Sequence, residues 1–207
     1  MNFIWFMLFS TIEGLSVYAL ALYIFRYNFT RFIWHSLIII ELINLQNYLT
    51  RAELASMSYS APTINILITI LFFKIIVRIP ILQSMFMTVV GYSIYMMLQT
   101  FIISFSFSLA KIQADPVKGY IVQCLTGVIG TFIGWAVYRK GFGFTFNFER
   151  LRFKGEQVFV MILIIVFILA LLLMMYFQDV YANLFGFLLT LIIFLFYSIR
   201  KEARQID

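Results

Sequence analysis

The chain has 207 residues, of which 63% are hydrophobic and only 12% are charged, and its mean hydropathy is +0.99. A soluble domain is about half apolar and about one quarter charged, so this composition excludes an ordinary soluble protein. The net charge of +6 does not indicate a nucleic-acid partner, because Lys and Arg beside membrane spans normally lie on the cytoplasmic side.

Apolar runs long enough to cross a bilayer occur seven times along the chain. We therefore predict an all-α integral membrane protein, with residues 1–207 forming a single bundle of seven transmembrane helices. The first run is as long as a full span, so we expect a retained helix rather than a cleaved signal peptide. The predicted spans are 3–25, 32–49, 61–79, 81–103, 119–138, 158–177 and 180–199.

The distribution of basic residues predicts the orientation of these spans. With the N-terminus outside, twelve of the fifteen Lys and Arg residues fall in inner loops or at inner helix ends, and three fall on the outer side. The positive-inside rule therefore favours an N-out, C-in topology. We expect the protein in a cell membrane, a bacterial inner membrane or a plasma membrane.

Two carboxyl groups inside the predicted membrane region are candidates for function, because ionisable residues are costly in hydrocarbon. Glu13 lies midway along the first span and Glu41 midway along the second, so antiparallel neighbours would place both at similar depth. One interpretation is a proton or cation relay, or a buried ligand site. The other is hydrogen bonding between helices. The candidate coupling residues are Glu13, Glu41, His35, Lys74 and Gln99.

Residue types that support covalent or metal chemistry are few. The single cysteine, Cys124, and the single histidine, His35, do not suffice for a four-ligand metal site. No Ser/His/Asp set and no glycine-rich phosphate loop can be identified. We therefore expect no metal, no cofactor and no enzymatic activity.

Small residues recur along one face of the predicted fifth span. Gly127, Gly130 and Gly134 are spaced for close approach of another helix backbone. Packing within the bundle is favoured over a dimer interface.

The largest predicted cytoplasmic loop comprises residues 139–157. Between positions 142 and 154, every second residue is aromatic at first and basic later. In an extended chain these side chains would share one face. Such a face can anchor the loop on the anionic inner leaflet of the membrane, or it can bind a separate protein. The aromatic-basic series is Phe142, Phe144, Phe146, Phe148, Arg150, Arg152 and Lys154.

Two functions agree with this pattern. The first is a sensor or adaptor that couples an outer or intramembrane site to a separate partner protein through the aromatic-basic loop. In architecture alone, a helical bundle with a short inner tail resembles the membrane input half of bacterial peptide-pheromone histidine kinases. The second is a small transporter, or the membrane subunit of one, in which Glu13 and Glu41 are coupling groups.

Overall fold

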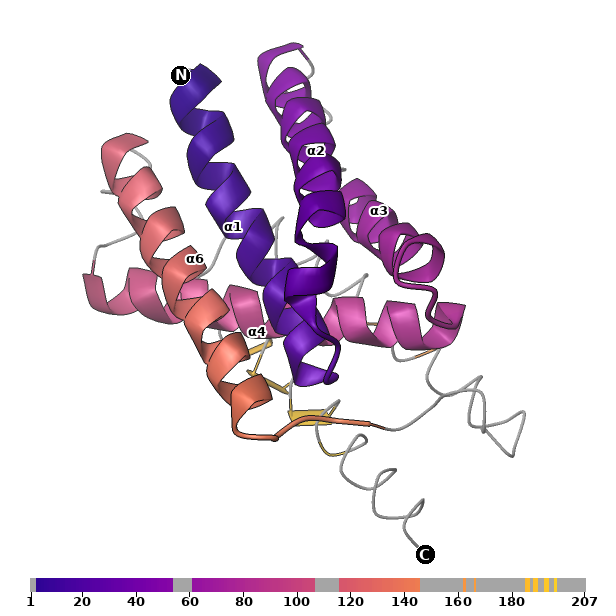
Figure 1. Cartoon of the computed structure of the whole chain (residues 1–207). Helices are drawn as coiled ribbons and strands as arrows, with labels where there is room; N and C mark the ends of the chain where they lie inside the picture. Colours follow the sequence, from indigo (N-terminus) through magenta and orange to yellow (C-terminus); the bar gives the residue numbers. More distant parts are fainter. Residues whose placement is uncertain are drawn as a thin grey trace, which may run out of the picture.

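The computed structural model describes residues 3–53, 61–106 and 116–145, together with scattered helical positions between residues 162 and 196 (Figure 1). Every regular element in these described parts is a helix. Five are α-helices and one is a short 3-10 helix. In chain order they are α1 (Phe3–Ile24), η1 (Phe29–Phe32), α2 (Ile33–Glu53), α3 (Ala61–Ile75), α4 (Ile81–Ser106) and α6 (Pro116–Arg139).

Three of these helices, α1, α4 and α6, are long and apolar enough to cross a membrane. At about 1.5 Å per residue, the 22 residues of α1 extend for about 33 Å, which matches the hydrocarbon thickness of a bilayer. The described part of the chain therefore has the composition and geometry of a helical membrane protein. The predicted sixth and seventh spans lie outside the described residues, apart from the scattered positions.

The third predicted span, 61–79, is shorter in the structure than the sequence indicated. Helix α3 ends at Ile75, and Arg78 adopts a left-handed conformation with φ of 63° before Pro80. The Ile79 N–H bonds back to the Phe73 carbonyl at 3.1 Å. The chain thus turns before the proline, because the residue that precedes a proline is unfavourable in a helical conformation.

Helix α1 is the central element and contacts α2, α4 and α6 (Figure 1). Its second half is buried on every side, from Ser16 to Ile24. A helix that is apolar around its whole circumference belongs in the interior of a bundle. Tyr18 of α1 packs edge to face on Phe72 of α3, with ring centroids 5.0 Å apart.

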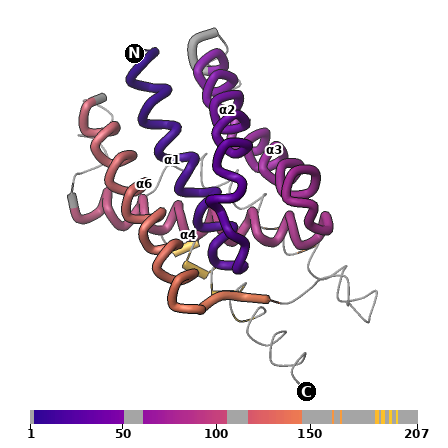
Figure 2. The backbone as a smooth tube through the Cα atoms, in the orientation of Figure 1, coloured from indigo at the N-terminus to yellow at the C-terminus, as the bar shows by residue number. Residues whose placement is uncertain are grey.

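The contacts of α1 also establish the directions of its neighbours. Helix α2 runs antiparallel to α1, since Gly14 approaches Ile40 while Phe3 near the start of α1 contacts Tyr48. Helix α6 runs parallel to α1, and α4 crosses behind both (Figures 1 and 2). Helices α1 and α6 thus run one way and α2 runs the other way, whereas α4 lies steeply across α1 and α6 (Figure 1).

The glycines of α6 lie against α1. A Cβ atom added to Gly127 would be 2.6 Å from Ile12 Cγ2 and 3.0 Å from the Ile12 carbonyl oxygen. One added to Gly130 would collide with the Ser16 hydroxyl, and one added to Gly134 would lie 3.3 Å from the Tyr23 ring. The stripe therefore lets two helix backbones approach closely within the bundle.

Helices α1 and α6 end in the same type of turn. In α1, Arg26 has a φ of 59°, its N–H bonds to the Tyr23 carbonyl, and the next N–H bonds to the Leu22 carbonyl. In α6, Gly141 takes the left-handed position with the equivalent pair of bonds. This is the Schellman motif, in which such a residue ends the helix and satisfies its last carbonyls.

Tyr27 follows the turn at the end of α1 and packs inward. Its hydroxyl accepts a hydrogen bond from Gln83 Nε2 at 3.2 Å. Burial raises the pKa of Tyr27, and the bond from Gln83 opposes this effect. The turn is thus tied to the start of α4.

The chain after α6 folds back onto the end of α1 (Figure 2). The Phe144 N–H donates a hydrogen bond to the Ile24 carbonyl at 2.8 Å, and the Phe144 ring lies 5.8 Å from that of Phe25. Gly143 has a φ of 141°, and a Cβ atom there would be 2.6 Å from the Ile24 oxygen. Only glycine fits at this position.

Candidate functional site in the helix bundle

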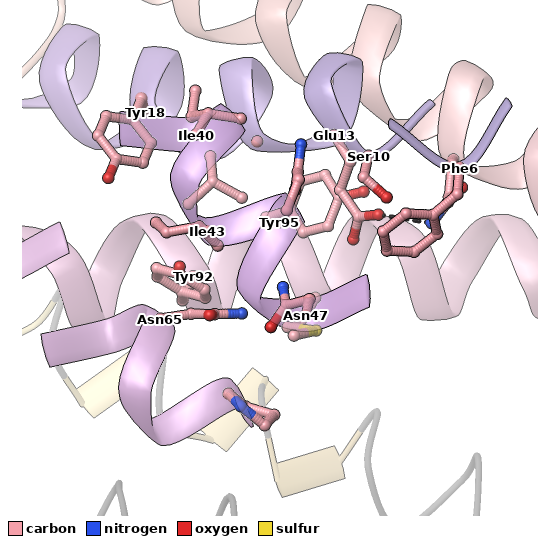
Figure 3. A pocket seen from close by; sticks show the side chains of 16 residues that line it. Phe6, Ser10, Glu13, Tyr18, Ile40, Ile43, Asn47, Asn65, Tyr92 and Tyr95 are labelled. Carbon is pink, nitrogen blue, oxygen red and sulfur yellow. Dashed lines mark hydrogen bonds between the residues drawn. The ribbon is translucent and has the colours of Figure 1, made fainter. Parts of the chain in front are cut away.

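A cavity of about 190 Å³ lies between all five described α-helices (Figure 3). We call it the polar cavity, because amides, hydroxyls and a carboxyl group form much of its wall. Three tyrosines, Tyr18, Tyr92 and Tyr95, line it together with apolar side chains. The other polar lining residues are Ser10, Glu13, Asn44, Asn47, Asn65 and Gln123.

Glu13 projects from α1 into the wall of the polar cavity. Its Oε2 atom accepts a hydrogen bond from Gln123 Nε2 at 2.8 Å, so α6 orients the carboxyl group. The adjacent Gly14 lets Ile40 of α2 come close to the α1 backbone. Among the described lining residues, Glu13 is the one acidic side chain, and none is Lys, Arg or His.

Two tyrosine hydroxyls in the cavity wall have no hydrogen-bond partner. The Tyr18 hydroxyl lies beside Thr69 and the Tyr95 hydroxyl beside Glu13, but neither contact has the geometry of a hydrogen bond. Both tyrosines are only 1% exposed. A buried hydroxyl without a partner costs about 1–3 kcal/mol, so these two hydroxyls are available to form hydrogen bonds with a bound molecule.

Two amide oxygens in the wall are also unpartnered. They are Oδ1 of Asn47 on α2 and Oδ1 of Asn65 on α3. The third tyrosine, Tyr92, differs because its hydroxyl lies 3.3 Å from Thr69 Oγ1. Since Thr69 donates its own proton to the Asn65 carbonyl at 2.8 Å, Tyr92 is the donor to Thr69.

Glu41 does not line the polar cavity, but Thr11 and the lining residue Asn44 connect it to the cavity wall. Thr11 Oγ1 lies 2.6 Å from Glu41 Oε1, 2.7 Å from the Met7 carbonyl oxygen and 3.1 Å from Asn44 Nδ2. One hydroxyl proton cannot serve both oxygens at once. The network joins α1 to α2 as interhelical hydrogen bonding does in membrane proteins.

The structure therefore brings some of the predicted coupling residues together and separates others. Glu13 lines the polar cavity. Glu41 forms a hydrogen bond with Thr11, which lies two residues before Glu13 on α1. His35 is exposed in the first turn of α2, and Lys74 is exposed near the end of α3. Gln99 is half-buried on α4 outside the cavity lining.

Several cavity residues were not identified from the sequence. Tyr92 and Tyr95 are three residues apart and so share one face of α4, while Gln123 and Asn65 are amides within apolar helices. A tyrosine in the middle of an apolar span, away from the interfacial belts, was the signal that could have identified them. The sequence does not show which faces of the neighbouring helices these side chains contact.

The first two aromatic residues of the aromatic-basic loop have different surroundings. Phe142 is 67% exposed, whereas Phe144 is half-buried against Phe25. The remaining residues of the aromatic-basic series lie outside the described residues. They are Phe146, Phe148, Arg150, Arg152 and Lys154.

Residues suited to hold a metal ion do not cluster in the described part of the chain, where no group of three His, Cys, Asp or Glu side chains occurs. The thiol of Cys124 is free, and the residue is half-buried on α6. The polar cavity is accordingly the strongest candidate site among the described residues. Comparison of the chain with family models, curated proteins and solved structures found no match.

Proposed function

We propose that this chain is a non-enzymatic membrane sensor or adaptor that binds a small ligand in the polar cavity and signals through its aromatic-basic loop. One observation carries the proposal. Helix α1 lines the cavity with Glu13 and Tyr18, and the last carbonyl of the same helix, that of Ile24, holds Phe144 of the loop.

The packing of α1 supports coupling between these two places. Its second half is buried on all sides, and closely packed interiors transmit displacements because they deform little. The loop backbone at Gly143 packs against the Ile24 carbonyl, where a Cβ atom would collide with the carbonyl oxygen. A small shift of α1 would therefore displace Phe144, as helix shifts do in other switching proteins.

The proposed orientation is seven spans with the N-terminus outside and the C-terminus inside, in a cell membrane. The alternating helix directions support it. So does the placement of basic residues at the end of the bundle where α1 and α6 finish, which are Arg26, Arg31, Arg139 and Lys140. The loop is then cytoplasmic, where it can bind an anionic leaflet or a separate protein.

The coupling can be tested by filling the polar cavity with a side chain. Asn65→Phe adds a ring to the cavity wall, and Leu67→Phe is the matched control because Leu67 is 52% exposed on the same helix. In a Cys124→Ser chain, a single cysteine at the exposed position 142 carries an environment-sensitive fluorophore. We expect Asn65→Phe to shift its emission and Leu67→Phe to leave it unchanged.

A further variant tests whether the emission shift at position 142 depends on the contact between the loop and the end of α1. Adding Phe144→Ala removes the ring that packs on Phe25, so the shift caused by Asn65→Phe should disappear. If filling the cavity leaves the emission at position 142 unchanged, the coupling proposal is wrong.

Transport is the second candidate function, and the location of Glu13 in the cavity wall favours it. A carboxyl group beside an intramembrane cavity can serve as a proton or cation coupling group. A transporter would move its ligand into proteoliposomes, and Glu13→Gln would abolish that uptake. A sensor would bind the same ligand without moving it across the membrane.

A further inference from the structure

We propose that the polar cavity binds a small organic cation, a primary monoamine of about ten non-hydrogen atoms, whose ammonium group contacts Glu13 and the unpartnered oxygens of the wall. The inference rests on the proposed function, since it takes the polar cavity as the ligand site.

The hydrogen-bonding groups of the wall require a ligand that donates. The Oδ1 atoms of Asn47 and Asn65 are unpartnered, and amide oxygens only accept hydrogen bonds. The buried hydroxyls of Tyr18 and Tyr95 can accept as well. A primary ammonium group offers three donors from one small centre, as the lysine side chain does.

The charge of the wall selects a cation. Glu13 is the carboxyl group of the lining, and the described lining contains no basic side chain. Hydrogen bonds between an ionised donor and a carboxylate are about twice as strong as neutral ones, and charges interact more strongly away from water. The Glu13 carboxyl group and the amide oxygens would repel an anionic ligand.

The remaining wall suits the apolar body of such an amine. Phe6, Tyr92 and Tyr95 contribute ring surfaces (Figure 3), and aromatic faces attract organic cations within about 6 Å. An apolar cavity of about 150 Å³ holds benzene, so about 190 Å³ accommodates a ring with a short aminoalkyl arm. The volume suits a small molecule of this kind.

The experiment compares three ligands of similar size with the full chain in detergent micelles by isothermal titration calorimetry. They are 2-phenylethylamine, which is cationic, 2-phenylethanol, which is neutral, and phenylacetate, which is anionic. We expect the amine to bind at least about tenfold more tightly than the alcohol, and phenylacetate to bind most weakly.

Substitutions then locate the binding site. Glu13→Gln keeps the size of the side chain and should lower the affinity for the amine by about tenfold. Tyr95→Phe should lower it by about threefold, because only a hydroxyl is lost. Tyr120→Phe is the matched control: Tyr120 lies on α6 outside the lining and stacks on Phe9, so the affinity should not change.

Each outcome is decisive. Equal binding of amine and alcohol, an unchanged affinity in Glu13→Gln, or no binding of the amine would overturn the inference, provided that the variants keep the thermal unfolding midpoint of the original chain. The proposed function fails separately, because the Asn65→Phe test needs no ligand. Amine binding without any effect of cavity filling on position 142 would support the ligand class and reject the coupling.

Discussion

The hydroxyl groups of three tyrosines in the cavity wall differ in their hydrogen bonding. Tyr92 donates to Thr69, whereas the hydroxyls of Tyr18 and Tyr95, which also line the polar cavity, form no hydrogen bond. Residues that lower the stability of a fold without a packing benefit tend to lie at functional sites, where natural proteins accept such a cost. Tyr18 and Tyr95 have this character.

A pair of tyrosine substitutions tests this interpretation. Tyr18→Phe removes an unpartnered buried hydroxyl, so the free energy of unfolding should rise by about 1 kcal/mol. Tyr92→Phe removes a bonded hydroxyl and should lower it by about 1 kcal/mol. Thermal or denaturant unfolding in micelles measures both. A Tyr18→Phe chain less stable than the original would show that this hydroxyl is satisfied.

At the scale of elements, the contact between α1 and α6 organises the candidate site. The glycine stripe brings the two backbones together, and that proximity lets Gln123 reach Glu13. The same contact places the end of α6 beside the end of α1, from which the loop returns to Ile24. The cavity and the loop attachment thus depend on one helix pair.

Enlarging a residue of the stripe should separate this pair. Gly127→Leu meets the Ile12 backbone, so we expect the free energy of unfolding to fall by about 1–3 kcal/mol. Val128→Leu is the control, since Val128 is 59% exposed, and its effect should stay within about 0.5 kcal/mol. Equal thermal midpoints for the two variants would contradict the packing described above.

At the scale of the whole molecule, the described helices place basic residues where α1 and α6 end and enclose polar groups between them. Helix directions alternate from α1 to α2, and α6 is parallel to α1. The basic residues that follow α1 and α6 therefore lie at the same end, where Arg26 is beside Gly141. An anionic leaflet on that side of the membrane would hold this end in place.

Cysteine labelling tests the proposed topology. In a Cys124→Ser chain, single cysteines replace Val117, Phe142 or Gln178, and intact cells are treated with a membrane-impermeant maleimide. With seven spans and an outer N-terminus, positions 117 and 178 should react, and position 142 should react only after permeabilisation. A reactive 142 beside a protected 117 would reverse the orientation, and a protected 178 would rule out the seven-span count.

The sequence by itself determined the helical class and the apolar character of the chain, because apolar runs of span length with few charges are typical of membrane helices, and the three long apolar helices of the described part are compatible with this class. It also placed Glu13 among the candidate residues, since a carboxyl group in an apolar run is conspicuous. The early end of α3 was not anticipated, because the hydropathy of the third run continues past the turn at Arg78.

Only the tertiary structure decided which polar residues share a site. Glu13 and Glu41 are equivalent by sequence, yet one lies in the polar cavity beside Gln123 and the other bonds to Thr11 outside it. The reason is the rotation of each helix about its own axis, which the sequence does not show. Hydrophobicity sets the depth of a helix in the membrane, but the side chains that meet are chosen by the rotation of each helix about its own axis, which close packing against its neighbours determines.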